Sequence, residues 1–172
     1  MKLLYIWVEG NDDERFINNI ILPLLEDKYG YIVVQQYANR NSARVCKFIN
    51  SINSQGHKYY FLADYNESKC ISQKKRKILR KYKCLDDKYI IIVKTEIESW
   101  YCAGLKNEIA NKLHIPSGNT ELITKEMFEL YRKKAKYDTK IEYLLAIIGS
   151  YAIEIAKSKN KTVAYYIGKM QD

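Results

Sequence analysis

The chain has 172 residues, 47% of them hydrophobic, which is enough for a buried core in one domain of ordinary size. Lys and Arg number 29 against 20 Asp and Glu, giving a formal net charge of +9. That excess favours an anionic partner, nucleic acid before an anionic membrane surface, although a solvated lysine-rich surface would give the same total. No apolar run has the length of a membrane span, which argues against a membrane protein.

The cysteines are far apart along the chain, with no CxxC pair and no histidine at zinc-ligand spacing. We therefore expect Cys46, Cys70, Cys84 and Cys102 to be reduced and mostly buried thiols of an intracellular protein. The N-terminal apolar stretch is too short for a signal peptide and lacks a small-residue cleavage site. The sequence thus predicts a cytoplasmic protein without membrane association.

Short apolar runs predict four strands, at 3–8, 31–37, 59–63 and 89–93. Amphipathic stretches predict helices at 11–30, 42–56, 71–82 and 98–112. Asn11 and Glu14 have the spacing of a capping box at the start of the first helix. Strands that alternate with helices predict an α/β fold, a Rossmann-like parallel sheet of about four strands with helices on both faces.

The pattern changes at a loop over 116–119, after which helices are predicted at 124–136 and 140–159. Residues 162–167 are compatible with one more strand. We therefore predict an α/β core over 1–115 and a helical extension over 116–172, packed together as one globular unit.

Acidic residues follow three of the predicted strands. Glu9 comes after the first, Asp64 after the third, and Glu96 and Glu98 after the fourth. Because parallel strands end at one edge of the sheet, these carboxylates are expected to meet there. Clustered carboxylates repel unless a cation neutralises them, and oxygen ligands suit Mg²⁺ or Mn²⁺. Such a site supports phosphoryl transfer or phosphodiester cleavage.

Each acid also has a purely structural explanation. Asp12, Asp13 and Glu14 would be favourable at a helix N-terminus through the helix dipole alone. Asp64 would be a common residue at the start of a turn, and Glu67 and Glu96 would be ordinary solvated side chains.

The segment VEGNDD at 8–13, followed by Asp-Tyr-Asn at 64–66, resembles the Toprim domain of primases, topoisomerases and OLD-family nucleases. Glu98-Ser99-Trp100 also resembles the Glu-x-Trp signature of small stand-alone Toprim-like proteins. The resemblance implies a general acid/base at Glu9, with Asp13 as a second catalytic residue. It implies Mg²⁺ or Mn²⁺ ligands at Glu9, Asp64 and Asn66, and Glu98 is a fourth predicted ligand. Asn66 stands where the family has a second Asp, which removes one negative charge that Glu67 or Glu98 could restore.

Receiver domains of two-component systems are an alternative, because they too carry acids after the first and third strands and a Thr or Ser after the fourth. Asp12, Asp13, Asp64 and Thr95 fit that pattern loosely. The acids after the first strand belong to a predicted helix start, however, and the fifth strand with its Lys is missing.

Basic residues concentrate in the predicted helix at 71–82. Contacts to nucleic-acid phosphates are predicted for this helix and for the region after the second strand, at Lys74, Lys75, Arg76, Lys77, Arg80, Lys81, Arg40 and Arg44. A solvated face of an amphipathic helix would look the same.

Together these features predict a Mg²⁺-dependent nuclease acting on DNA or RNA. The alternative is a catalytically degenerate Toprim-like module that binds nucleic acid or a partner protein such as a separate ATPase.

Overall fold

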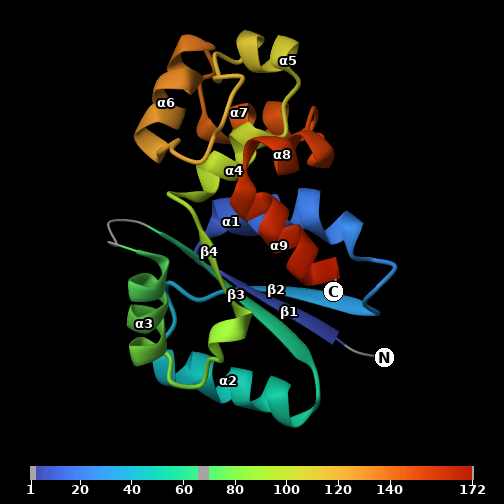
Figure 1. Ribbon diagram of the computed structural model, residues 1–172, viewed down its shortest axis with the longest axis vertical. Helices are drawn as coiled ribbons and strands as arrows, with labels where there is room; N and C mark the ends of the chain where they lie inside the picture. The colour runs from blue at the N-terminus through green and yellow to red at the C-terminus, as the bar shows by residue number, and fades with distance from the viewer. Residues whose placement is uncertain (1–2, 66–69, 172) are drawn as a thin grey trace. The chain divides into compact units, whose positions relative to one another are not determined.

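The computed structural model describes residues 3–65 and 70–171 (Figure 1). Its strands are β1 (Leu3–Val8), β2 (Tyr31–Gln36), β3 (Lys58–Asp64) and β4 (Ile90–Val93). Its α-helices are α1 (Asn11–Phe16), α2 (Ser42–Ser54), α3 (Ile71–Lys81), α4 (Ile97–Ala103), α5 (Asn107–Lys112), α6 (Lys125–Lys134), α7 (Lys140–Ile148), α8 (Ile153–Lys159) and α9 (Lys161–Gln171). A π-helix (Ile17–Ile21) and a 3₁₀ turn (Leu22–Leu24) extend α1, and another 3₁₀ turn (Asp87–Tyr89) precedes β4.

The strands form one sheet in the order β2-β1-β3-β4, and β1 runs parallel to both of its neighbours. The α/β class with a helical C-terminal part is therefore confirmed. The chain divides into two compact units, residues 1–92 and 93–172, which we describe separately. Helices α4 and α5, expected within a 1–115 core, belong to the second unit, where α4 packs against α7 and α8.

The two faces of the sheet bury alternate residues of each strand, as a pleated strand requires. On one face, Trp7 and Phe61 belong to a core cluster that also contains residues of α2 and α3, such as Val45 and Ile78. Leu4, Ile6 and Val8 alternate with these positions and are fully buried. Gln36 is in register with Val8, and its side chain reaches α1 on that second face. Helices thus cover both faces of the sheet in the first unit.

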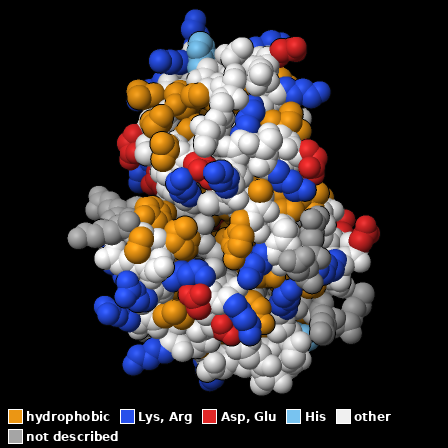
Figure 2. Space-filling view, in the orientation of Figure 1, with side chains coloured by type: hydrophobic (Ala, Val, Ile, Leu, Met, Phe, Trp, Pro, Cys, Tyr) orange, Lys and Arg blue, Asp and Glu red, His pale blue; other side chains and the backbone are white. Residues whose placement is uncertain are grey.

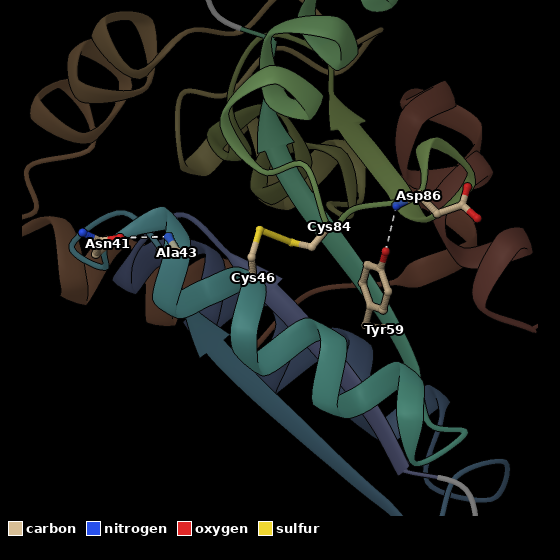
Figure 3. The surroundings of a disulfide bond; sticks show 6 residues. All are labelled: Asn41, Ala43, Cys46, Tyr59, Cys84 and Asp86. Carbon is tan, nitrogen blue, oxygen red and sulfur yellow. Dashed lines mark hydrogen bonds between the residues drawn. A yellow bond between two sulfur atoms is a disulfide. The ribbon is translucent and has the colours of Figure 1, made fainter.

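A disulfide links Cys46 of α2 to Cys84, which follows α3 (Figure 3). Their Cα atoms are 5.3 Å apart, a normal separation for a disulfide. The expectation of reduced thiols is therefore wrong for these two residues. The two cysteines are 38 residues apart in the sequence, and no local pattern indicates that they are neighbours. In the structure, α2 and the segment after α3 meet over the same face of the sheet. Cys102 is a buried thiol as expected, whereas Cys70 is exposed.

Two predicted segments differ from the structure. The first starts one residue earlier than expected: Gly10 is the N-cap, and its N–H donates to Asp13 Oδ2 at 3.1 Å. Asp13 therefore takes the capping position that the Asn11–Glu14 spacing had suggested for Glu14. Residues 162–167 are helical within α9, so a strand there is wrong.

The segments 98–112 and 140–159 are each interrupted. Gly104 ends α4, and a Cβ at this position would lie 2.5 Å from the ring of Tyr151. Tyr151 follows α7, and the N–H of Ala152 donates to the Gly104 carbonyl at 2.7 Å. The two interruptions therefore pack against each other, and this contact fixes both chain reversals.

Asn160 connects three parts of the second unit. Its side chain is buried, and its Oδ1 accepts from the N–H groups of Thr162 and Val163 at 3.1 and 3.2 Å, which caps α9. Its Nδ2 donates to the Ser99 carbonyl at 3.4 Å and to Thr120 Oγ1 at 3.3 Å. One amide thus joins the start of α9 to α4 and to the loop before α6.

We expect Asn160→Ala to lower the free energy of unfolding by about 3 kcal/mol, because it removes a helix cap and leaves buried polar groups unsatisfied. Urea unfolding followed by circular dichroism would measure the change. Ser158→Ala is the control, since the Ser158 hydroxyl only donates to the Ile155 carbonyl at an exposed position. Equal effects of the two substitutions would contradict the assigned role.

Candidate functional site

Two predicted site residues lie at the carboxyl ends of adjacent strands. Glu9 directly follows β1, and Asp64 is the last residue of β3. The parallel register aligns Trp7 with Phe61, so Glu9 lies two residues and Asp64 three residues beyond one aligned pair. The sheet topology therefore brings both carboxylates to the same edge, where ligands bind in parallel α/β sheets. Oδ1 of Asp64 is buried there.

A third acid, Asp13, belongs to this edge through the first turn of α1. Its side chain is only 7% exposed, and its Oδ2 accepts from the Gly10 N–H next to Glu9. Asp13 therefore holds the connection between β1 and α1 in place. This structural role is enough to explain an acid at this position. The catalytic role of Asp13 stays a prediction.

The phenol of Tyr37 is buried near these acids. Tyr37 follows β2, stacks on Phe61 with ring centroids 4.2 Å apart, and donates its hydroxyl to the Leu62 carbonyl at 2.9 Å. Burial raises the pKa of this phenol well above its usual value. The negative charges of Glu9, Asp13 and Asp64 raise it further. The charges of all three carboxylates thus act on one buried phenol, and nothing in the sequence distinguishes Tyr37 from the other tyrosines at strand ends.

The acids beside them on α1 have structural partners. Asp12 forms an ion pair with Arg15 at 2.6 Å. The side-chain amide of Gln36 donates to Glu14 and, at 2.7 Å, to Asn11. The helix-start explanation therefore accounts for Asp12 and Glu14.

The chemistry of the donor set fits a hard divalent cation, because Glu9, Asp13 and Asp64 all offer carboxylate oxygens. Within residues 3–65 and 70–171, however, no group of three His, Cys, Asp or Glu lies close enough to hold a metal ion. Asn66 and Glu67, named above as a predicted ligand and a nearby acid, lie outside the described residues. The metal ligand set stays a prediction.

Glu98, the remaining predicted ligand, lies on α4 in the second unit. It is 5% exposed, and its Oε1 accepts from the Lys140 ammonium of α7 at 2.8 Å. Trp100 of the same Glu-Ser-Trp segment is fully buried and donates its Nε1–H to Thr162 at 2.8 Å. In the described structure, therefore, this segment anchors α4 to α7 and α9.

The connection from β4 to α4 is held in a strained conformation. Thr95 has a φ of 67°, a left-handed value that is costly for a β-branched residue. Its hydroxyl donates to the Glu121 carbonyl at 2.7 Å, and Lys94 forms an ion pair with the Glu121 carboxylate at 2.9 Å. Burial works to raise the pKa of Glu121, but Lys94 and the Lys161 N–H outweigh it and the pKa is lowered. The Glu96 carboxylate accepts from the Lys125 N–H at 2.6 Å and so caps α6. Hydrogen bonds within the second unit thus hold both Thr95 and Glu96 in place.

Helix α3 presents the predicted basic surface. Figure 2 shows Lys and Arg side chains gathered over this helix, at the lower left of the view. Ile78 is buried in the core, whereas Arg76, Lys77, Arg80 and Lys81 are exposed. Lys74 is half-buried, and Lys75 is held by Asp87 at 3.0 Å. The helix follows β3 in the chain, so its basic face belongs to the same unit as Glu9 and Asp64.

Two arginines flank the end of β2. Arg40 donates to Gln35 Oε1 at 2.7 Å, and its guanidinium lies 5.7 Å from the centre of the Trp7 ring. Arg44 is exposed on the first turn of α2, where Asn41 caps the helix by accepting from the Ala43 N–H at 2.8 Å (Figure 3). Both side chains are accessible to a phosphate.

The parallel α/β sheet with its helical C-terminal part is also found in solved structures of other proteins. The C-terminal region of the Burkholderia pseudomallei OLD protein matches with a TM-score of 0.59 at 15% identity, covering 98% of this chain and 97% of that one. The C-terminal region of the Xanthomonas campestris pv. campestris OLD protein matches with a TM-score of 0.47 at 14% identity, covering 96% and 95%. No protein-family model matches the sequence, and no curated protein does.

The first of these matches shows that the chain has the fold of an OLD C-terminal region. OLD-family nucleases are among the proteins whose Toprim domain this sequence resembles. The fold that this resemblance predicts is therefore confirmed. The relation to small stand-alone proteins with a Glu-x-Trp signature stays a prediction. Within the described residues, no helix combines the length and the apolar character needed to cross a membrane.

Proposed function

We propose that this protein is a Mg²⁺- or Mn²⁺-dependent nuclease that hydrolyses phosphodiester bonds in nucleic acid. One observation carries the proposal: Glu9 and Asp64 lie at the carboxyl ends of adjacent parallel strands, at the ligand-binding edge of an OLD-type fold. Carboxylates gathered at a ligand-binding edge cost free energy unless a bound cation neutralises them. The fold alone would not imply the chemistry, so the proposal depends on the acids at this edge.

Glu9 is the residue we assign to proton transfer. Its carboxylate is partly exposed at the end of β1, so water can reach it, and its backbone is fixed by the Gly10–Asp13 hydrogen bond. Asp13 is the second catalytic candidate, acting from a buried position beside it. A general base must lie within hydrogen-bonding reach of the proton that it accepts, and the edge of the sheet provides such a place.

We propose Glu9, Asp64 and Asn66 as the residues that hold the cation; the fourth predicted ligand, Glu98, is instead paired with Lys140 in the second unit. When bound, Mg²⁺ or Mn²⁺ would polarise the scissile phosphate and stabilise the charge that develops on it. The amide oxygen of Asn66 is a weaker metal ligand than a carboxylate oxygen because it is uncharged. The site therefore carries one negative charge less than an Asp-x-Asp site would.

The basic residues of α3, with Arg40 and Arg44, are proposed to hold the nucleic-acid backbone. Each Lys or Arg that meets a phosphate adds affinity that depends on salt and not on base sequence. These contacts would position the strand, while the acids at the sheet edge act on the phosphodiester bond.

A second candidate function is a non-catalytic module that binds nucleic acid or a separate ATPase. The observation in its favour is Asn66 in place of an acid, together with the match to a structure that is one region of a longer protein. Binding that survives both EDTA and the substitution Glu9→Gln would support this candidate over the nuclease.

The proposal is tested by measuring cleavage and binding of single-stranded DNA, double-stranded DNA and RNA with Mg²⁺, with Mn²⁺ and with EDTA. We expect cleavage with either cation, none with EDTA, and a higher melting temperature with Mn²⁺ present. The absence of nucleic-acid binding at low salt would contradict both candidates.

The double substitution Arg76→Gln/Lys77→Gln tests the basic face of α3. We expect about tenfold weaker binding at low salt and a salt slope smaller by about 2, because two phosphate contacts are lost. Lys133→Gln/Lys134→Gln on α6 makes the same change of charge in the second unit and is the matched control. An equal loss from both variants would show that net charge, not the face of α3, governs binding.

A further inference from the structure

Strand β2 lies at the edge of the sheet, and its outer side pairs with no other described strand. Among the strands of the described chain, β2 pairs with β1 alone and so ends the sheet. Its six residues, YIVVQQ, include no charge and no proline, although 28% of the chain is charged. Proteins normally guard such edges with lysines, prolines or bulges, because the unpaired backbone groups accept another strand. The composition of β2 therefore suits pairing.

An exposed tyrosine projects at the start of this edge, and a pocket lies at each end of it. Tyr31 at the start of β2 is 66% exposed. A polar pocket of about 320 Å³ lies at the end of β2, lined by Glu14, Val34, Gln35, Gln36, Asn39 and Arg40. A second pocket of about 280 Å³ surrounds the base of Tyr31 and is lined by Leu22, Glu26, Tyr29, Gly30, Tyr31 and Ile32.

We propose that β2 is the pairing edge of a symmetric dimer, in which β2 of a second copy of this chain lies antiparallel beside it. A two-fold axis perpendicular to the sheet, passing between the two copies of Val33, places Tyr31 across from Gln35 and Ile32 across from Val34, so that facing side chains lie on the same side of the sheet. Each interaction then occurs twice, as a closed two-fold interface requires. The strand addition joins two four-stranded sheets into one of eight strands, which is within the usual range for open sheets.

The shape of the edge fits this arrangement. Antiparallel pairing carries the Tyr31 ring of one copy to the pocket at the Gln36 end of the other. That pocket is large enough for a phenol ring, and its Gln and Asn side chains offer hydrogen-bond partners for the hydroxyl. A parallel partner strand would instead bring the Tyr31 ends of the two copies together. The polar pocket at the Gln36 end would then stay unfilled in each copy.

Charge complementarity also favours a second copy as the occupant. Arg40 lines the pocket at one end of β2, and Glu26 lines the pocket at the other end. Both side chains are exposed, and a guanidinium has five N–H donors, of which Arg40 directs Nη2 to Gln35. The two-fold axis brings Arg40 of each copy to the end of the edge that carries Glu26 of the other. The interface therefore gains two ion pairs of opposite charge.

Sedimentation velocity of the full chain over a range of micromolar concentrations tests the proposal. We expect a reversible monomer–dimer equilibrium and a dissociation constant that rises at least about tenfold in Tyr31→Lys, because an exposed aromatic anchor is replaced by a charge. Tyr165→Lys on α9 is the matched control, since Tyr165 is 55% exposed in the second unit, and it should leave the equilibrium unchanged. Amide hydrogen exchange over residues 31–36 should slow as the dimer forms.

A charge exchange locates the interface independently. Arg40→Glu and Glu26→Arg should each weaken the dimer, and the double variant should restore it, because the ion pair is rebuilt with reversed signs. A chain that stays monomeric at every concentration would overturn the proposal. So would a dimer that is indifferent to Tyr31→Lys, or one in which the double charge exchange fails to restore the lost affinity.

Discussion

Glu9→Gln is expected to lower metal-dependent cleavage of nucleic acid by at least about a hundredfold, because it removes the proposed proton acceptor while keeping the size of the side chain. The substitution also removes one negative charge from the sheet edge, so the stabilisation of the protein by Mn²⁺ should decrease with it. Initial rates under saturating Mg²⁺ and melting temperatures with and without Mn²⁺ measure the two effects.

Glu14→Gln is the matched control for this prediction. It makes the same chemical change on the neighbouring helix turn, where the carboxylate accepts from Gln36 and is assigned no part in the reaction. We expect its cleavage rate to stay within about twofold of the parent protein. Full activity in Glu9→Gln would remove Glu9 from the mechanism, and equal losses in both variants would point to a general effect on α1.

The double variant Cys46→Ser/Cys84→Ser is expected to unfold with about 4 kcal/mol less free energy than the parent protein. The disulfide closes a segment of 38 residues, and releasing it restores the loop-closure entropy of the unfolded chain, which sets this magnitude. Urea unfolding without reductant measures the difference. The parent protein unfolded in the presence of dithiothreitol should behave like the double variant.

Cys70→Ser is the control for the disulfide, because Cys70 is an exposed free thiol that caps α3 by accepting from the Gln73 N–H, a position that serine also favours. Mass spectrometry after alkylation without reduction gives a second, independent measurement. Modification of all the cysteines under those conditions would contradict the disulfide, and modification of Cys70 alone or with Cys102 would support it.

The fold could be predicted from the sequence because each strand is a short apolar run between clear helix signals. The four strands were located within two residues of their observed ends, and their alternation with helices fixed the parallel sheet. Helix interruptions were harder to predict. The break at Gly104 depends on its contact with the ring of Tyr151. The hydrophobic periodicity of either segment gives no information about a contact between residues so far apart in the sequence.

The candidate site could be predicted in part, for a similar reason. The position of Glu9 and Asp64 at one edge of the sheet could be predicted because parallel strands all end at the same edge. Tyr37 was missed, since its importance arises from three carboxylates that only the folded chain brings around it. The disulfide was missed because composition and spacing carry no information on which cysteines face each other.

If a divalent cation binds at the sheet edge as proposed, the phenol of Tyr37 would report its arrival. Burial raises the pKa of this hydroxyl, and the charges of Glu9, Asp13 and Asp64 raise it further. A cation bound among those carboxylates would offset their charge, and the pKa of Tyr37 would fall toward the value that burial alone sets. Ultraviolet difference spectra of this one phenol would then follow cation binding without an added label.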